Sequence, residues 1–247
     1  MVFISIGIRA RVEVEALNMT EALGAYTRHR TVSLLKKYKS KDGIGYKIIS
    51  VPAISGQSIA HGYHRALVEI AKRMKLPVCN ECQQYDVIGG FIKHATAGKG
   101  ITEIDIVKSC VVEDITGFLV TDAGVRRTSA VMFSYMVPDI EIAEASIEPQ
   151  FHVRYNFATN QHNPFQIESG TALYTLGIAM DVDKIGKAGD TILDDRVERI
   201  KAAFLALTAL IEGLMFGAKK ARYLPITEVT GGVAALSHPI PFMVTPP

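Results

Sequence analysis

A turn that leads directly into a helix carries the clearest chemistry in the sequence. Ser55, Gly56, Gln57 and Ser58 precede apolar residues that recur at helical spacing. The first turn of a helix offers unpaired backbone N–H groups and the positive end of the helix dipole, which together favour a bound phosphate. The side chains that could extend such a site within two turns are His61, His64 and Arg65. The sequence therefore predicts an anion-binding helix start, although any one of these residues alone could have a purely structural role.

Further cationic side chains are spread along the chain. Between Arg28 and Lys47, seven basic residues accompany one acid, so this segment carries about +6 and the remainder about −4. Such a segment indicates a local anionic partner, but a solvated, repulsive loop would have the same composition. The candidates are Arg28, His29 and Arg30 in this segment, Arg9 and Arg11, Arg126 and Arg127, and His152, Arg154 and Asn156.

The last three candidates lie beside the aromatic rings of Phe151 and Tyr155. Stacking rings mixed with cations and amides are typical of nucleic-acid surfaces. The alternatives are purely structural: both rings could pack in a core, and Arg9 could pair with a nearby glutamate. Taken together, the cationic and aromatic side chains favour nucleic acid.

Signatures of catalysis and of a metal are incomplete. The sequence contains no G-x-x-x-x-G-K-[ST] loop, no G-x-G-x-x-G turn and no G-x-S-x-G elbow. Cys79 and Cys82 form a single C-x-x-C pair, and a structural zinc ion would need two more ligands, for which Cys110 and His94 are the candidates. We therefore expect no enzyme, no metal and no other cofactor, and we interpret the cysteines as ordinary thiols.

These side chains must be positioned by a small set of elements. Hydrophobic patterns predict helices over about 58–74 and 197–214 and strands over 4–16, 129–137, 171–182 and 222–229, the last leading into a Gly-Gly turn. The first strand would present Arg9 and Arg11 on an open polar face. The order strand, helix, strand, strand, helix, strand predicts an α+β, ferredoxin-like fold of the kind found in RNA-recognition-motif (RRM) domains. Because the aromatic RNP sequence of ordinary RRMs is missing, any RNA contact should be made mainly to the backbone.

Length and composition agree with a folded protein of the cell interior. A chain of 247 residues with 48% hydrophobic residues can bury a large core and is not disordered. No charge-free apolar run approaches the ~20 residues of a membrane span, and the N-terminal order of apolar and basic residues is the reverse of a secretory signal. Three cysteines, an odd number, indicate a reducing compartment. We expect a cytoplasmic protein with no membrane contact.

Several segments in order resemble the archaeal DevR-type CRISPR-associated family, whose members form the repeated backbone of the type I-A Cascade surveillance complex. These segments are GIRARVEVEALNM, TRHR, VPAISGQSIAHGYHRALVEIA, RRTSAV, EPQFHVRYN and GAKKARYLP. The SGQSIAHG helix start is the most specific of them. The resemblance implies an RRM-like palm (residues 1–74 and 128–247), an inserted helical lobe (75–127) and a thumb-like β insertion at about 139–170.

The resemblance also implies a function. Members of the family polymerise head-to-tail along CRISPR RNA (crRNA), bind its phosphate backbone, and leave the guide bases free to pair with a target DNA strand. The implied partners are crRNA, other copies of the chain in a helical filament, and a Cascade subunit that binds the crRNA handle, while cleavage is left to other subunits. The family's RNA-contacting helix start corresponds to Ser55, Gly56, Gln57 and Ser58, followed by His61 and His64, and its thumb-side basic patch corresponds to His152, Arg154 and Asn156.

Two functions of other classes remain as alternatives. A DNA-binding autoregulator of the CRISPR locus, which the family's older name suggests, would need a recognition helix with polar residues facing a groove. Neither predicted helix offers one that is not flanked by core positions. A metal-dependent enzyme built on Cys79, Cys82 and a histidine would require stoichiometric zinc.

Overall fold

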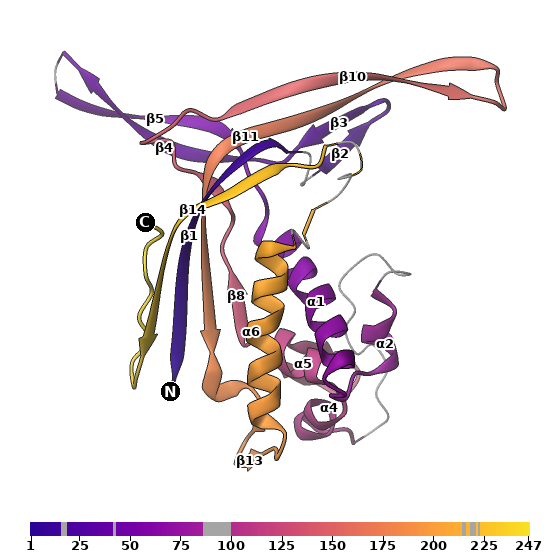
Figure 1. The fold of residues 1–247 in the computed structure, drawn as a ribbon, viewed down its shortest axis with the longest axis vertical. Helices are drawn as coiled ribbons and strands as arrows, with labels where there is room; N and C mark the ends of the chain where they lie inside the picture. Colours follow the sequence, from indigo (N-terminus) through magenta and orange to yellow (C-terminus); the bar gives the residue numbers. More distant parts are fainter. Residues whose placement is uncertain (16–18, 42, 86–99, 214–215, 218–220, 222) are drawn as a thin grey trace.

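A long central strand, β11 (Gln161–Asp181), pairs with most of the other strands of the main sheet. The computed structural model describes residues 1–15, 19–41, 43–85, 100–213, 216–217, 221 and 223–247. Figure 1 shows an α+β arrangement in which the sheet stands beside a group of helices and two long ribbons extend from its upper end.

The sheet grows outward from β11 on both sides. Strand β1 (Phe3–Glu15) runs antiparallel to it, with Phe3 opposite Asp181, and β14 (Ile226–Ser237) forms the outer edge beyond β1. The short strands β8 (Val131–Phe133) and β9 (Val137–Pro138) pair with the second half of β11. The first half pairs with β10 (Ser146–Asn156) and with β3 (Tyr26–His29), which in turn pairs with β2 (Met19–Leu23).

Two long helices cover one face of the sheet. Helices α1 (Gly56–Arg73) and α6 (Arg196–Glu212) lie side by side in Figure 1, and the Tyr63 hydroxyl of α1 donates a 3.0 Å hydrogen bond to the Ala203 carbonyl of α6. Apolar residues of both helices form one buried core with Ile8, Tyr174 and Ile178 of the sheet. None of the helices within the described ranges is long and apolar enough to cross a membrane.

The segment between α1 and β8 forms a smaller unit beside these helices. It contains α2 (Asn80–Gln83), α4 (Glu103–Ser109), α5 (Val111–Thr116) and the ribbon of β6 (Phe118–Val120) and β7 (Val125–Arg127). After β11, a 3₁₀ turn (Val182–Lys184) leads to β12 (Lys187–Ala188) and β13 (Thr191–Ile192). A second core cluster of Ile106, Val107, Phe118, Val120 and Ala188 joins α4, the β6–β7 ribbon and β12.

Two antiparallel ribbons protrude from the sheet. The first is formed by β4 (Thr31–Ser40) and β5 (Gly43–Pro52), and the second by β10 and the first half of β11. They extend in opposite directions at the top of Figure 1, away from the helices. The basic segment of the sequence therefore forms a hairpin. The division of the chain into palm, lobe and thumb remains a prediction.

Both long helices and the first and third core strands confirm the sequence pattern, but three details of the predicted strands are wrong. Val14 continues the alternation of apolar residues in the predicted strand 4–16, which would place it on the core face, yet a bulge with φ of 55° leaves it 51% exposed and buries Glu15 instead. Residues 134–136 interrupt the predicted strand 129–137 between β8 and β9. The Gly-Gly pair is no turn, because β14 continues through Gly231 and Gly232 to Ser237.

The open polar face predicted for β1 is also wrong in part, because the C-terminal segment lies on it. The Val244 N–H donates a 3.1 Å hydrogen bond to the Ser5 hydroxyl, which is fully buried. A Cβ on Gly7 would lie 2.7 Å from Pro246, so the backbones approach closely there. On β14 the approach is looser, because a Cβ on Gly231 would lie 3.2 Å from the Pro247 ring. Glycine at position 7 therefore makes room for the crossing segment.

Candidate nucleic-acid interface

The predicted anion site at the start of α1 has the expected local geometry. Ser55 caps the helix, since its hydroxyl accepts a 3.1 Å hydrogen bond from the Ser58 N–H. Gly56 packs against β8, where an added Cβ would lie 2.6 Å from the Phe133 carbonyl oxygen. Gln57 is exposed, and Ser58 and His61 are partly exposed. The helix start is therefore fixed against the sheet while its outer side remains accessible.

Arg30 lies next to this helix start. Its carbonyl accepts a 2.9 Å hydrogen bond from the Ala53 N–H two residues before Ser55, and its guanidinium lies 3.5 Å from the Tyr135 hydroxyl. Arg28 is exposed on β3. The Arg30 backbone therefore lies close to the start of α1, while its guanidinium contacts Tyr135.

Four predicted candidates are buried. They are Ser55, the cap of α1, and His29, His64 and Arg127, with exposed fractions of 7%, 2%, 1% and 6%. Their burial does not favour contact with RNA, and that contact stays a prediction. His64 points into the core side of α1, because it falls on the same helical face as Leu67 and Val68. The sequence could not separate it from His61, which lies three residues earlier and is partly exposed.

His29 belongs to a buried polar cluster with the glutamate that the β1 bulge turns inward. Its Nε2 lies 3.3 Å from Glu15 Oε1, its Nδ1 lies 2.8 Å from the Arg30 carbonyl, and its backbone N–H donates to Glu168 Oε2 at 2.9 Å. Burial alone would lower the pKa of His29, but the hydrogen bond and charge of Glu15 outweigh burial and raise it. The pair stabilises the junction of β1, β3 and β11.

Arg127 is the centre of a buried ion-pair network. Its Nη2 lies 2.7 Å from Asp114 Oδ1 and its Nη1 lies 2.6 Å from Glu103 Oε1. Asp114 also accepts from Arg199 of α6 at 3.2 Å. The network ties α4, α5 and β7 to α6, so Arg127 stabilises the fold. Its neighbour Arg126 is exposed on the other side of β7.

The remaining cationic candidates are spread over separate surfaces. Arg9 forms a 2.9 Å ion pair with Asp139, and Arg11 pairs with Glu13 at 3.3 Å and Glu228 at 3.1 Å, so the two β1 arginines have acidic neighbours. The Arg65 guanidinium lies over the ring of Tyr85, 5.5 Å from its centroid. These arginines are not gathered with the helix start into one continuous patch.

The ribbon of β10 and β11 has one polar and one apolar side. His152, Arg154 and Asn156 alternate along β10 and therefore share one side. Arg154 is exposed, whereas His152 stacks on Phe165 at 5.2 Å and hydrogen-bonds the Tyr223 hydroxyl, and Asn156 accepts from the Ala158 N–H at 3.0 Å in the turn. The opposite side carries Phe151 and Val153, which are 76% and 66% exposed.

The ribbon of β4 and β5 supplies a surface that the sequence indicated only by its charge. Lys36 lies directly opposite Lys47 on one side, while Lys37 and Lys39 lie on the other. The side of Lys37 also presents the exposed apolar side chains Leu35, Ile44, Tyr46 and Ile48. The alternation of lysine with apolar residues is visible in the sequence. The sequence did not indicate that the apolar side chains on this face of the ribbon would be exposed.

The cysteines are the described side chains that could hold a metal. Cys110 lies beside Cys79 and Cys82, with all three sulfurs within 4.8 Å of one another. His94, the other ligand considered from the sequence, lies outside the described residues.

The features above define an α+β protein with cationic side chains at a helix start and on two protruding ribbons. Residues 6–247 match the family described as CRISPR-associated negative auto-regulator DevR/Csa2. A protein named CRISPR-associated protein Cas7/Csa2 1 from Saccharolobus solfataricus is 37% identical over 99% of this chain and 81% of its own length. Another from the same organism, named CRISPR-associated aCascade subunit Cas7/Csa2 2, is 33% identical over 98% of this chain and 82% of its own length.

The chain therefore belongs to the DevR/Csa2 family of CRISPR-associated proteins, in agreement with the resemblance found in its sequence. A chain of a solved structure titled Type IV-B CRISPR Complex is also similar over 94% of this chain and 91% of its own, with a TM-score of 0.47 and 15% sequence identity. At that distance the likeness carries no information about function.

Proposed function

We propose that this chain binds crRNA along its phosphate backbone and assembles with copies of itself into the helical backbone of a type I-A Cascade-like antiviral complex. Membership of the DevR/Csa2 family supports this function, as does a relative that carries the name aCascade subunit. In this proposal the guide bases stay exposed for pairing with a target DNA strand, and another subunit binds the crRNA handle. The chain itself cuts nothing and acts as a scaffold without enzymatic activity.

The observation that carries RNA binding is the pair of lysines that face each other across the β4–β5 ribbon. Like charges directly opposite one another in an antiparallel pair destabilise it. Lys36 and Lys47 occupy such positions, and Lys37, Lys39 and Lys41 are exposed on the same ribbon. The negative phosphates of a bound nucleic acid would offset this repulsion, and each lysine–phosphate contact would also release condensed counterions. The ribbon should therefore be more stable with a nucleic-acid backbone bound than without one.

The apolar sides of both ribbons support assembly with other copies. Leu35, Ile44, Tyr46 and Ile48 are each more than 60% exposed on the first ribbon. Phe151 and Val153 have similar exposure on the second. Contiguous exposed apolar side chains typically mark protein–protein contacts. A ribbon that docks on a different surface of the next copy makes a heterologous contact, which produces an open helix when the rotation does not close.

The finer fold assignment belongs to the same proposal. We assign β1, α1, β8–β9, β11, α6 and β14 to an RRM-like palm, the segment 75–127 to a lobe, and the β10–β11 ribbon to a thumb. The order of β14, β1, β11 and then β8–β9 across the sheet, with both helices on one face, supports the palm. The start of α1 and both ribbons lie at one end of this arrangement in Figure 1.

Salt-dependent RNA binding tests the proposal. Replacing Lys36 and Lys47 by alanine should weaken the binding of a single-stranded crRNA and reduce the slope of log K against log salt by about 1.4, since each phosphate contact on a single strand contributes about 0.7. Lys72→Ala with Lys201→Ala is the matched control, because these lysines pair with Glu69 and Glu198 on the helices. An unchanged slope in the ribbon variant would refute the phosphate contact.

The helix start and the thumb are tested by separate variants. Gln57→Glu combined with His61→Ala should weaken RNA binding in a gel shift at moderate salt while the protein stays folded, and Gln84→Glu, exposed on another segment, is the charge-matched control. His152→Ala combined with Arg154→Ala should weaken RNA binding and shorten the filaments seen by electron microscopy. Unchanged affinity in the first variant would remove the helix start from the interface.

The family description as a negative auto-regulator keeps a DNA-binding alternative open. Competition separates the two functions. Duplex DNA of the CRISPR promoter should fail to displace bound crRNA at equal concentration. Nucleic acid that co-purifies as short RNA of uniform spacer-repeat form supports the scaffold, and sequence-specific binding of the promoter in its place would favour the regulator.

A further inference from the structure

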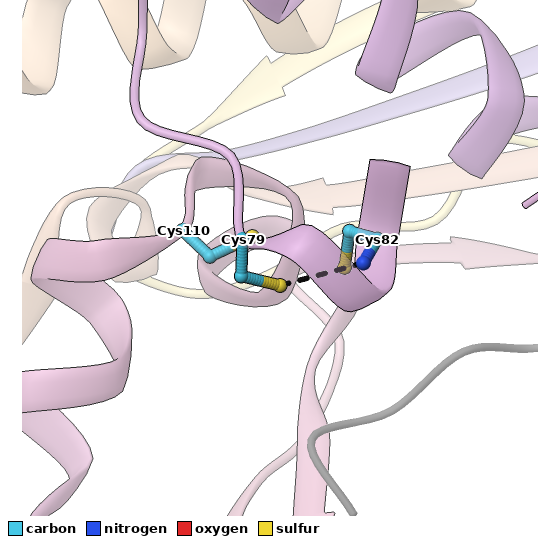
Figure 2. A group of neighbouring side chains, drawn as sticks. All are labelled: Cys79, Cys82 and Cys110. Carbon is cyan, nitrogen blue, oxygen red and sulfur yellow. Dashed lines mark hydrogen bonds between the residues drawn. The ribbon is translucent and has the colours of Figure 1, made fainter. Parts of the chain in front are cut away.

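All three cysteines of the chain meet at one point in the structure. Cys79 caps the first turn of α2 and Cys82 lies within that helix, whereas Cys110 lies at the junction of α4 and α5 about thirty residues later. Their sulfur atoms lie within 4.8 Å of one another, and Figure 2 shows the three side chains converging from these two segments. Cys82 and Cys110 are fully buried and Cys79 is partly exposed.

One backbone N–H group donates a hydrogen bond inside the cluster. The Cys82 N–H points at the Cys79 sulfur from 3.4 Å, the contact drawn as a dashed line in Figure 2. Cys79 is the N-cap of α2, and Cys110 lies between the end of α4 and the start of α5.

A buried thiolate without a cation would be costly, because the transfer of an unpaired charge into a protein interior is strongly unfavourable. A thiophilic ion removes that cost. At a zinc–sulfur distance of about 2.3 Å, tetrahedral ligands lie about 3.8 Å apart, so sulfurs already within 4.8 Å need to shift by at most about 1 Å. The two segments are already joined beside the cluster by a 2.8 Å hydrogen bond from the Val111 N–H to the Pro77 carbonyl.

We propose that Cys79, Cys82 and Cys110 bind a single thiophilic metal ion, zinc in the first instance, as three thiolate ligands. The C-x-x-C pair forms one half of a structural zinc site, and Cys110 supplies a third sulfur from a distant segment. Three ligands leave one position of a tetrahedral ion for water or another donor. The ion links the segment after α1 to the start of α5 and so closes the loop between them. This inference does not depend on RNA binding and reverses the expectation, drawn from the sequence, that the cysteines are ordinary thiols.

Metal content of the full chain, purified without chelators from zinc-supplemented cells, tests the site. We expect about one zinc per chain by plasma mass spectrometry. Cobalt added to the metal-free protein should produce the sulfur-to-cobalt charge-transfer and tetrahedral d–d absorption of a thiolate site. Removal of the ion should lower the melting temperature, because a ligand bound only to the folded state stabilises it.

Cys79→Ser is the decisive variant. Serine is a favoured helix cap, so the variant keeps the bond to the Cys82 N–H and remains folded while one thiolate is lost. We expect its zinc affinity to fall at least tenfold, whereas Asn80→Ser, exposed in the same turn, should keep the ion. Zinc retained by Cys79→Ser would overturn the proposal. So would three freely titrating thiols with no cobalt spectrum, or a Cys79–Cys82 disulfide in protein purified without oxygen.

Discussion

Arg126 and Arg127 are adjacent basic residues whose replacement should have opposite consequences. In the sequence they form one cationic pair before a core strand. In the structure Arg126 is exposed, while the Arg127 side chain is only 2% exposed. We predict that Arg127→Met severely destabilises the protein, whereas Arg126→Met leaves its stability within about 0.5 kcal/mol of the parent.

The magnitude follows from the groups that Arg127 satisfies. Its guanidinium donates to both the carboxylate and the carbonyl of Asp114, at 2.7 and 2.8 Å, and to Glu103 at 2.6 Å and the Lys187 carbonyl at 3.0 Å. Asp114 is fully buried, and after the substitution Arg199 is its only remaining cation among the residues the structure describes. Removing one partner of a buried ion pair costs about 3–5 kcal/mol. For a chain of this size that loss lowers the melting temperature by roughly 6–20 °C.

Urea unfolding followed by circular dichroism measures both variants under the same conditions. Glu103→Gln is an internal control, because the Glu103 side chain is 39% exposed and glutamine keeps an oxygen that can accept from Arg127. We expect it to cost less than Arg127→Met. The reasoning would be refuted if Arg127→Met cost no more than Glu103→Gln. It would also be refuted if Arg127→Met lost RNA binding while it unfolded at the same urea concentration as the parent.

Two further predictions concern His29 and Gly117, which are both buried. The raised pKa of His29 means that the His29–Glu15 pair stabilises the protein fully below pH about 6.5 and that this contribution is lost as pH rises through the folded-state pKa. The difference in unfolding free energy between the parent and His29→Gln should therefore shrink with rising pH, and a difference that grows would contradict the assignment. Gly117→Ala should lower the free energy of unfolding by about 1–3 kcal/mol more than Gly124→Ala, measured by the same urea unfolding. Both glycines have positive φ, but only the Gly117 Cβ would collide with backbone, 2.4 Å from the Arg127 carbonyl oxygen. Equal costs would show that backbone strain alone decides the effect.

The parts of the fold that the sequence predicted are those set by a long, regular period. The stripe of Ile59, Tyr63 and Leu67 is buried in α1, and the alternation of Ile8, Ala10 and Val12 is buried in β1. Each of these patterns repeats often enough that one face of the element must meet the core. The capped turn at Ser55 was predicted for a related reason, since a cap depends only on residues next to it in sequence.

Long-range contacts account for what the sequence could not show. Whether a cation is exposed depends on the distant carboxylate that faces it, and Arg127 meets Asp114 only because β7 folds back beside α5. The bulge at Val14 depends on Glu15 finding His29 on another strand. The same limitation applied to Cys110, whose position beside the C-x-x-C pair is a consequence of tertiary structure alone.

The C-terminal segment also constrains how RNA could lie on this molecule. Ordinary RRM domains stack bases on aromatic side chains of the open sheet face. Here Ser5 and Gly7 of that face are covered by residues 244–246, and Arg9 is engaged by Asp139. Bases therefore have no free aromatic platform on the part of β1 that this segment covers. Contacts from the ribbons and the α1 start would instead grip phosphates at the end of the sheet, which is the arrangement a scaffold needs if the guide bases are to pair with another strand.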